Sequence, residues 1–101
     1  MFDKILEAQR KAEEIKSRLD TITVKSEVEG GKIVITATAN KSITSVSLDP
    51  DFLKTADNEQ LEELLLTAMN KVLQQADLVS QTEMQAATRD MMGGLGNIFG
   101  K

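Results

Sequence analysis

The segment from residue 23 to residue 48 alternates apolar and polar residues around the pair Gly30-Gly31, and this pattern limits the fold more than any other feature. Two consecutive glycines suit a two-residue turn of the primed type, which needs positive φ at both positions. The predicted pairs, outward from that turn, are Glu29 with Lys32, Val28 with Ile33, Ser26 with Ile35, and Val24 with Ala37. The apolar residues then share one face of the hairpin.

A second turn is predicted at Asn40-Lys41, because Asn tolerates the left-handed backbone region. The pairs that follow are Ala37 with Thr44, Ile35 with Val46, and Ile33 with Leu48. Both turns give the same apolar face, so we expect a three-stranded antiparallel meander with Val46 and Leu48 in the core. Pro50 has no N–H to donate to a ladder. We therefore interpret Asp49-Pro50 as the end of the last strand and the opening of a short connection.

A helix is predicted over residues 3–20, before the meander. Its apolar residues follow the three-and-four spacing of a heptad, at Ile5, Ala8, Ala12, Ile15, Leu19 and Ile22. The predicted helix is about 27 Å long at about 1.5 Å per residue. Its apolar stripe is narrow and rich in Ala, which favours close packing on one partner over full burial.

A longer helix is predicted over residues 58–92, after the meander. Asp57 and Gln60 resemble a capping box, and Gly93-Gly94 is the predicted end. Such a helix is about 52 Å long, whereas strands of this size are about 20 Å long. The helix must therefore break near Ser80, or its second half must project beyond the sheet. The fold class is α+β in the order α-β-β-β-α, with one domain at residues 1–92 and a flexible Gly-rich tail at residues 93–101.

The sequence contains no Cys and no His, which removes the thiol nucleophile, the commonest general base and the usual zinc ligands. Asp49, Asp51 and Asp57 are the nearest approach to a carboxylate cluster. No Cys, His or Tyr exists to act with them. We therefore expect Asp49 to have a structural role, and we expect no enzyme activity, cofactor, metal ion or small-molecule substrate.

The charged N-terminus does not resemble a signal peptide, and the apolar runs are far shorter than the roughly 20 residues of a membrane span. A cytoplasmic protein without a membrane partner is the default expectation. The net charge of −4 is unevenly distributed, because residues 49–101 carry nine acidic and four basic side chains, while residues 1–20 carry five of each.

The basic residues of the first helix are sorted around its circumference. With Ile5 at heptad position a, Lys4, Lys11 and Arg18 all fall at position g. A row of cations spaced about 10.5 Å apart can follow a phosphate backbone. The alternative is a solvated helix in which Glu7 pairs with Lys11 and Glu14 pairs with Arg18. We expect no exposed aromatic side chain, and so no stacking on single strands.

The segment "GKIVITATANKSITSVSLDP" and the order of a helix, three strands and a long helix together resemble the YbaB/EbfC family of bacterial nucleoid-associated proteins. The family's middle segment reads approximately G-x-V-x-V-T-x-x-G-x-x-x-x-x-x-V-x-I-D-P. The ungapped matches in "GKIVITATANKSITSVSLDP" are Gly31, Ile33, Ile35, Thr36, Val46, Leu48, Asp49 and Pro50. Ala39 stands where the family usually has Gly. The N-terminal "AQRKAEEIKSRL" and the Gly-rich tail are also similar to the family.

The resemblance implies a homodimer in the nucleoid whose helices project like the arms of tweezers and hold double-stranded DNA with little sequence preference. The distal half of the last helix, around Met84, Ala87 and Met91, would then pack on the first helix. The phosphate contacts expected on that basis are Lys4, Arg10, Lys11, Lys16 and Arg18, with Arg89 from the facing helix. The acidic second half leaves an alternative open, a protein-interaction module in replication, repair or recombination that binds DNA weakly or not at all.

Overall fold

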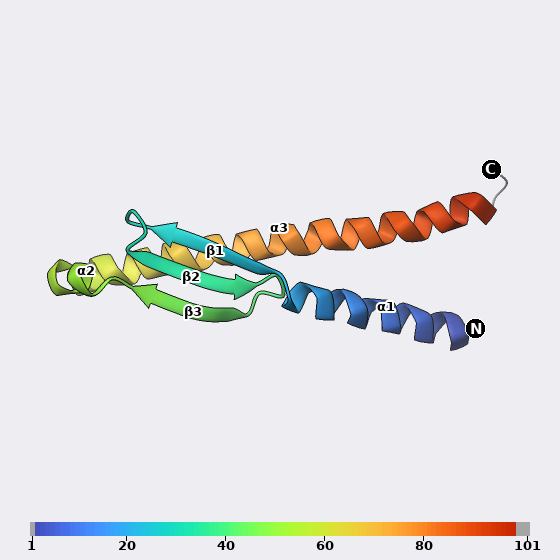
Figure 1. The fold of residues 1–101 in the computed structure, drawn as a ribbon, viewed down its shortest axis with the longest axis horizontal. Helices are drawn as coiled ribbons and strands as arrows, with labels where there is room; N and C mark the ends of the chain where they lie inside the picture. The colour runs from blue at the N-terminus through green and yellow to red at the C-terminus, as the bar shows by residue number, and fades with distance from the viewer. Residues whose placement is uncertain (1, 99–101) are drawn as a thin grey trace.

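The computed structural model describes the backbone of residues 2–98 and the side chains of residues 2–89. Its elements are α1 (Phe2–Asp20), β1 (Thr23–Val28), β2 (Ile33–Thr38), β3 (Ile43–Leu48), α2 (Pro50–Thr55) and α3 (Asn58–Ile98). The predicted α+β fold is confirmed, with one short helix added. The described chain is elongated, with principal extents of 66, 26 and 18 Å, and α1 and the distal half of α3 extend past the same end of the sheet (Figure 1).

The first hairpin has the predicted register. Val28 lies opposite Ile33, and Ser26 lies opposite Ile35. Gly30 and Gly31 have φ angles of 63° and 87°, and the Lys32 N–H donates to the Glu29 carbonyl at 3.3 Å. The glycines are therefore used as expected, at positions where an L side chain would be strained.

The second hairpin follows the prediction along most of its length and departs from it near the turn. Ala37 lies opposite Ile43 instead of Thr44, because a bulge interrupts the register between Thr36 and Ala37. The turn closes by a bond from the Thr38 N–H to the Ser42 carbonyl at 2.8 Å. The left-handed residue is Lys41, with φ 68°, and not its neighbour Asn40. One extra residue on β3 absorbs the mismatch between this turn and the ladder.

The core lies between α3 and the first two strands, over which α3 packs (Figure 1). Its buried residues are Ile33, Ile35, Ala37, Phe52, Ala68 and Val72. Ser26 is a buried polar residue among them, and its hydroxyl donates to the Ala68 carbonyl at 2.7 Å. This bond satisfies the buried hydroxyl and fixes the position of α3 along β1.

The edge strand β3 is not covered in the same way. Val46 lies opposite Ile35, yet 49% of its surface is exposed, while Ile35 is fully buried. Leu48 is half-buried. The prediction that Val46 is a core residue is therefore wrong for the single chain, because one helix is wide enough to cover two strands and not the third.

Two boundaries also differ from the prediction. Residues 50–55 form the helix α2 where a plain connection was expected. The helix α3 has no break at Ser80, and its backbone continues past Gly93-Gly94 to Ile98. Gly lowers helix propensity by about 1 kcal/mol without forbidding helical dihedrals, so the glycine pair did not mark the end. The flexible tail at residues 93–101 stays a prediction, and residues 99–101 lie outside the described residues.

The two projecting helices contact each other near the sheet and less toward their ends. Leu19 is buried and Ile15 is half-buried, whereas Ile5, Ala8 and Ala12 are exposed. On α3, Ala87 is half-buried and Met84 is exposed; the Met91 side chain lies outside the described ones. Ala87 therefore lies beside α1 as expected, whereas Met84 is 53% exposed. Most of the α1 stripe is exposed within the described chain.

Candidate nucleic-acid interface

The basic residues predicted to contact phosphates all lie on exposed helical positions. Lys4, Arg10, Lys11, Lys16 and Arg18 are on α1, and Arg89 is on the distal part of α3. The charges at the two ends of α1 suit its helix dipole, with Asp3 in its first turn and Arg18 in its last. These charges oppose the partial charges of the helix ends.

Lys11 and Arg18 line one side of a hollow of about 340 Å³ between the two projecting helices. Glu14 and Ile15 complete that side, and Ala87 contributes the opposite wall from α3. Lys4 belongs to the same row by its seven-residue spacing. The row of Lys4, Lys11 and Arg18 therefore runs along the side of α1 that borders α3.

Arg89 does not face the hollow between the two helices. It follows Ala87 by two residues, which is about 200° around the helix axis. Since Ala87 faces the hollow, the Arg89 side chain leaves α3 on the far side. Arg10 and Lys16 also leave α1 away from the row of Lys4, Lys11 and Arg18, so the six candidates do not form a single patch.

The cations of α1 form no ion pair with any side chain described for residues 2–89. The pairs found there are Lys41 with Asp77 at 2.9 Å and Lys54 with Asp51 at 3.8 Å. The pairings of Glu7 with Lys11 and Glu14 with Arg18, which would suit a merely solvated helix, are thus absent from this part of the chain. The basic side chains of α1 remain available to an anionic partner.

The β2–β3 turn fixes the base of α1, a contact that no pattern in the sequence predicts. The Asn40 side-chain amide donates to the Lys16 carbonyl at 2.8 Å and to Asp20 Oδ1 at 2.6 Å. The adjacent Lys41 pairs with Asp77 of α3. Consecutive residues of one turn therefore hold both projecting helices.

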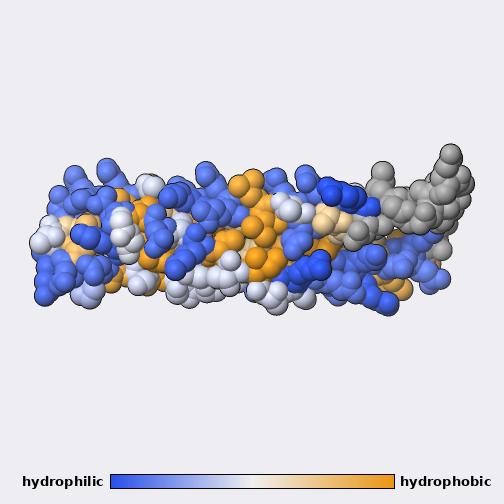
Figure 2. All heavy atoms as spheres, turned by 45° about the horizontal axis from the view of Figure 1, so that its top comes forward, coloured by the Kyte–Doolittle hydropathy of each residue, from blue (hydrophilic) through white to orange (hydrophobic). Residues whose placement is uncertain are grey.

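Apolar side chains gather where the sheet gives way to the two helices, and Figure 2 shows them as a band across the middle of a mostly hydrophilic body. A hollow of about 390 Å³ is lined there by Ile22, Leu78, Val79, Thr82 and Glu83. Phe2 is 81% exposed, so the expectation of no exposed aromatic is wrong. Phe52 is buried and Phe99 lies outside the described residues, which leaves a single ring for stacking among residues 2–98.

Comparison with known proteins decides the family. Residues 1–91 match the model of the YbaB/EbfC DNA-binding family. The chain belongs to this family. A nucleoid-associated protein of Flavobacterium johnsoniae is 39% identical over 98% of this chain and 94% of its own length. A nucleoid-associated protein of Bradyrhizobium diazoefficiens is 32% identical over 100% of this chain and 94% of its own.

The fold of this YbaB/EbfC chain is also found in a solved structure. The crystal structure of an uncharacterized protein from Helicobacter pylori superposes with a TM-score of 0.67. The match covers 90% of this chain and 92% of that one, at 13% sequence identity. At this identity the likeness shows the shared fold and nothing further. Membership of a DNA-binding family agrees with the expectation that the chain is not an enzyme.

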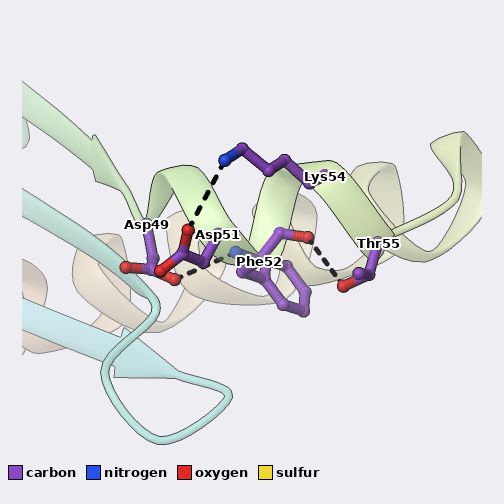
Figure 3. A network of polar contacts seen from close by, with 5 residues as sticks. All are labelled: Asp49, Asp51, Phe52, Lys54 and Thr55. Atoms are coloured by element: carbon purple, nitrogen blue, oxygen red, sulfur yellow. Dashed lines mark hydrogen bonds and ion pairs between the residues drawn. The ribbon is translucent and has the colours of Figure 1, made fainter.

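The acidic residues that follow β3 in this YbaB/EbfC chain have structural roles. The Asp49 carboxylate accepts from the Phe52 N–H at 2.9 Å and caps α2, with Pro50 as the first helical residue (Figure 3). Asp51 lies 3.8 Å from Lys54. Asp57 caps α3 by accepting from the Gln60 N–H at 2.7 Å, as the capping pattern predicted. The acids are thus used as helix caps and in an exposed ion pair.

In the part of the chain that the structure describes, no group of three or more acidic side chains is placed to hold a metal ion. Within the same residues, no helix combines the length and the apolar character needed to cross a membrane.

Proposed function

We propose that this protein is a nucleoid-associated protein that binds duplex DNA as a homodimer, mainly through phosphate contacts and with little sequence preference. The row of Lys4, Lys11 and Arg18 carries the proposal, because these side chains are exposed and lack ion pairs with described residues. Membership of a DNA-binding family supports the ligand. The names of the relatives support the location in the nucleoid.

The chemistry of the row fits the phosphate backbone better than the bases. Successive cations are separated by seven residues, about 10.5 Å along the helix axis. Lys and Arg that neutralise phosphates release condensed counterions, which gives affinity without sequence information. The acidic residues of the second half lie on other elements, and DNA affinity depends on the local surface more than on the net charge of −4.

The homodimer supplies what one chain lacks. A single α1 offers one row of cations, and the apolar stripe at Ile5, Ala8 and Ala12 has no described partner. A second copy provides a second row, so that the projecting helices of two chains hold the duplex from two sides. On this arrangement Lys11 and Arg18 are the central contacts, and Lys4 extends the row along α1. Arg10 and Lys16 lie on other sides of α1 and are proposed to reach phosphates beside the row.

The deciding experiment is a DNA-binding titration at several salt concentrations, run beside a measurement of molar mass in solution. The variant Lys11→Glu with Arg18→Glu is compared with Lys25→Glu with Lys54→Glu, which changes the net charge equally but leaves α1 intact. We expect only the first variant to lose binding at low salt. The slope of log K against log salt is expected to fall by about 0.9 per phosphate contact removed.

The alternative function is a protein-interaction module with weak or no DNA binding. The acidic surface of α3 favours it, because Glu59, Glu62 and Glu63 are all exposed. Absence of a complex with the wild-type protein at about 50 mM salt and micromolar concentration would support this alternative. Retention of DNA binding by Lys11→Glu with Arg18→Glu would instead move the site to another surface.

A further inference from the structure

The β2–β3 turn is placed to act on both projecting helices, because it lies where α1 leaves the sheet (Figure 1). We call residues 39–41 of this turn the strap. The Ala39 N–H donates to the Ile22 carbonyl at 3.0 Å, at the junction of α1 and β1. The Asn40 amide bonds to the end of α1, and Lys41 pairs with Asp77 of α3 at 2.9 Å. The strap therefore touches α1, α3 and the junction with the sheet.

Lys41 has a backbone conformation that suits other residues better. Its φ is 68°, in the left-handed region where Gly, Asn and Asp are the usual choices. The preceding residue is Asn, yet Asn40 is not left-handed, and its side chain is used on α1 instead. A Lys in the less favourable place is explained by a use for its side chain. The pair with Asp77 supplies that use.

The Asp77 carboxylate is held in position for this pair. Its Oδ1 meets Lys41, and its Oδ2 accepts from the Gln81 side-chain amide at 2.9 Å. Gln81 lies one helical turn further along α3, where a bond of this kind orients the carboxylate on the helix surface. The pair is exposed, with 53% of the Lys41 side chain and 44% of the Asp77 side chain accessible. Because exposed pairs add little to stability, we expect its effect in the placement of the helices and not in unfolding.

Small movements at the strap are magnified along α1. Leu19 is buried at the base of this helix, whereas residues 2–14 are all exposed. Apolar burial attracts without fixing a direction, while hydrogen bonds are directional. Lys4 lies 16 residues before Asp20, about 24 Å along the helix axis. A tilt of about 10° at the base would therefore move Lys4 by about 4 Å.

We propose that the strap sets the gap between α1 and α3, and that Lys41 and Asp77 are positioning residues for DNA binding. The Cα atoms of Asn40 and Lys41 are about 3.8 Å apart, so the two helices are tied to nearly one point of the sheet. Neither Lys41 nor Asp77 needs to touch DNA for this role. The effect on DNA rests on the proposed function, whereas the effect on the gap does not.

The gap is measured between two spin labels in one chain, on Glu7→Cys of α1 and Gln85→Cys of α3. Both positions are exposed, and the chain has no native cysteine. Labelled chains are refolded with an excess of the corresponding chain without cysteines, so that each distance comes from a single chain. No DNA is present, and thermal unfolding establishes that each variant folds.

The test variant is Lys41→Asp, because Asp tolerates the left-handed backbone. Its matched control is Lys54→Asp, which makes the same charge change and removes the pair with Asp51 at the end of the molecule far from α1. We expect only Lys41→Asp to lengthen the distance between the labels, and Lys41→Asp with Asp77→Lys to restore it. An unchanged distance in Lys41→Asp would overturn the proposal. Should Lys41→Asp fail to fold, Asp77→Ala removes the pair from the α3 side and is judged in the same way.

DNA affinity is measured on the same variants without labels. We expect Lys41→Asp to weaken binding by about two- to fivefold, the population shift that loss of one exposed pair allows, and Lys54→Asp to bind like the wild type. Normal affinity beside a lengthened distance would overturn the positioning role. Weakened affinity beside an unchanged distance would overturn it too, because Lys41 would then be a direct contact. A wild type that binds no DNA would reject the proposed function, and the label distances would still decide whether the strap sets the gap.

Discussion

The side-chain amide of Asn40 lies 2.6 Å from Oδ1 of Asp20 and thereby joins the β2–β3 turn to the last turn of α1. The same amide reaches the Lys16 carbonyl, so that one side chain satisfies groups at the exposed end of a helix. The direction in which α1 leaves the sheet depends on this contact together with the burial of Leu19.

Replacing Asn40 with Ala is expected to loosen α1 without unfolding the sheet. We expect the free energy of unfolding to fall by about 1 kcal/mol, the usual net contribution of such hydrogen bonds. Amide exchange should accelerate in residues 2–20 more than in β1 or β2. Asn70→Ala, at an exposed position of α3, serves as the control. Unchanged exchange in α1 would show that the burial of Leu19 alone holds the helix.

Replacing Ser26 with Ala removes the buried bond to the Ala68 carbonyl. The free energy of unfolding in urea is expected to fall by about 1 kcal/mol. Ser45→Ala changes the same residue type at an exposed position of β3 and should alter stability by less than about 0.5 kcal/mol. Equal effects of the two substitutions would mean that the Ser26 hydroxyl does not stabilise the packing of α3 on β1.

Replacing Asp49 tests whether its carboxylate only caps α2 or also takes part in DNA binding. Asp49→Ala is expected to lower the free energy of unfolding by about 1 kcal/mol, whereas Asp49→Asn should change it little because Asn also caps helices. DNA affinity should be the same in both variants, since α2 lies at the end of the molecule opposite to α1 (Figure 1). A loss of DNA binding in the folded Asp49→Asn protein would contradict a purely structural role.

Single substitutions can distinguish the two sides of the projecting helices. We expect Lys11→Ala to reduce the salt dependence of DNA binding by about one phosphate contact, a slope change near 0.9. Arg89→Ala should reduce it less, because this side chain points away from the hollow that Lys11 lines. Titrations of both variants at matched salt concentrations provide the comparison. Equal slopes would extend the DNA-binding surface around α3.

The strands could be predicted closely because each signal is local. Gly30-Gly31 fixes one turn, and alternation then fixes every pair of the first hairpin. The bulge at Ala37 could not be predicted, because it depends on how the chain from Thr38 to Ser42 closes its own hydrogen bonds. The helix α2 carries a readable signal, since Asp at the N-cap followed by Pro is a common helix start. The interpretation of the same dipeptide as a strand end is correct, and it omits the helix that begins there.

The position of the candidate site could be predicted from the sequence. The contacts that hold α1 in place could not. Heptad spacing places Lys4, Lys11 and Arg18 in one row whatever the tertiary structure. The Asn40 contact with α1 joins residues that are 20 to 24 positions apart, and no periodic pattern encodes such a contact. The exposure of Val46 was missed because alternation shows which face a residue occupies, and the width of the covering helix decides whether that face is buried.

The unbroken course of α3 from the sheet to the projecting end restricts which changes of length the protein can accept. Each inserted residue turns everything beyond it by about 100° around the helix axis. One residue added after Ser80 would leave the core intact and still move Ala87 away from Lys11 and Arg18. An insertion of seven residues would nearly restore the original phase while lengthening the arm by about 10.5 Å. The number of residues between Ala68 and Ala87 therefore decides whether Ala87 faces α1 when Ala68 faces the core. Neither residue decides this alone.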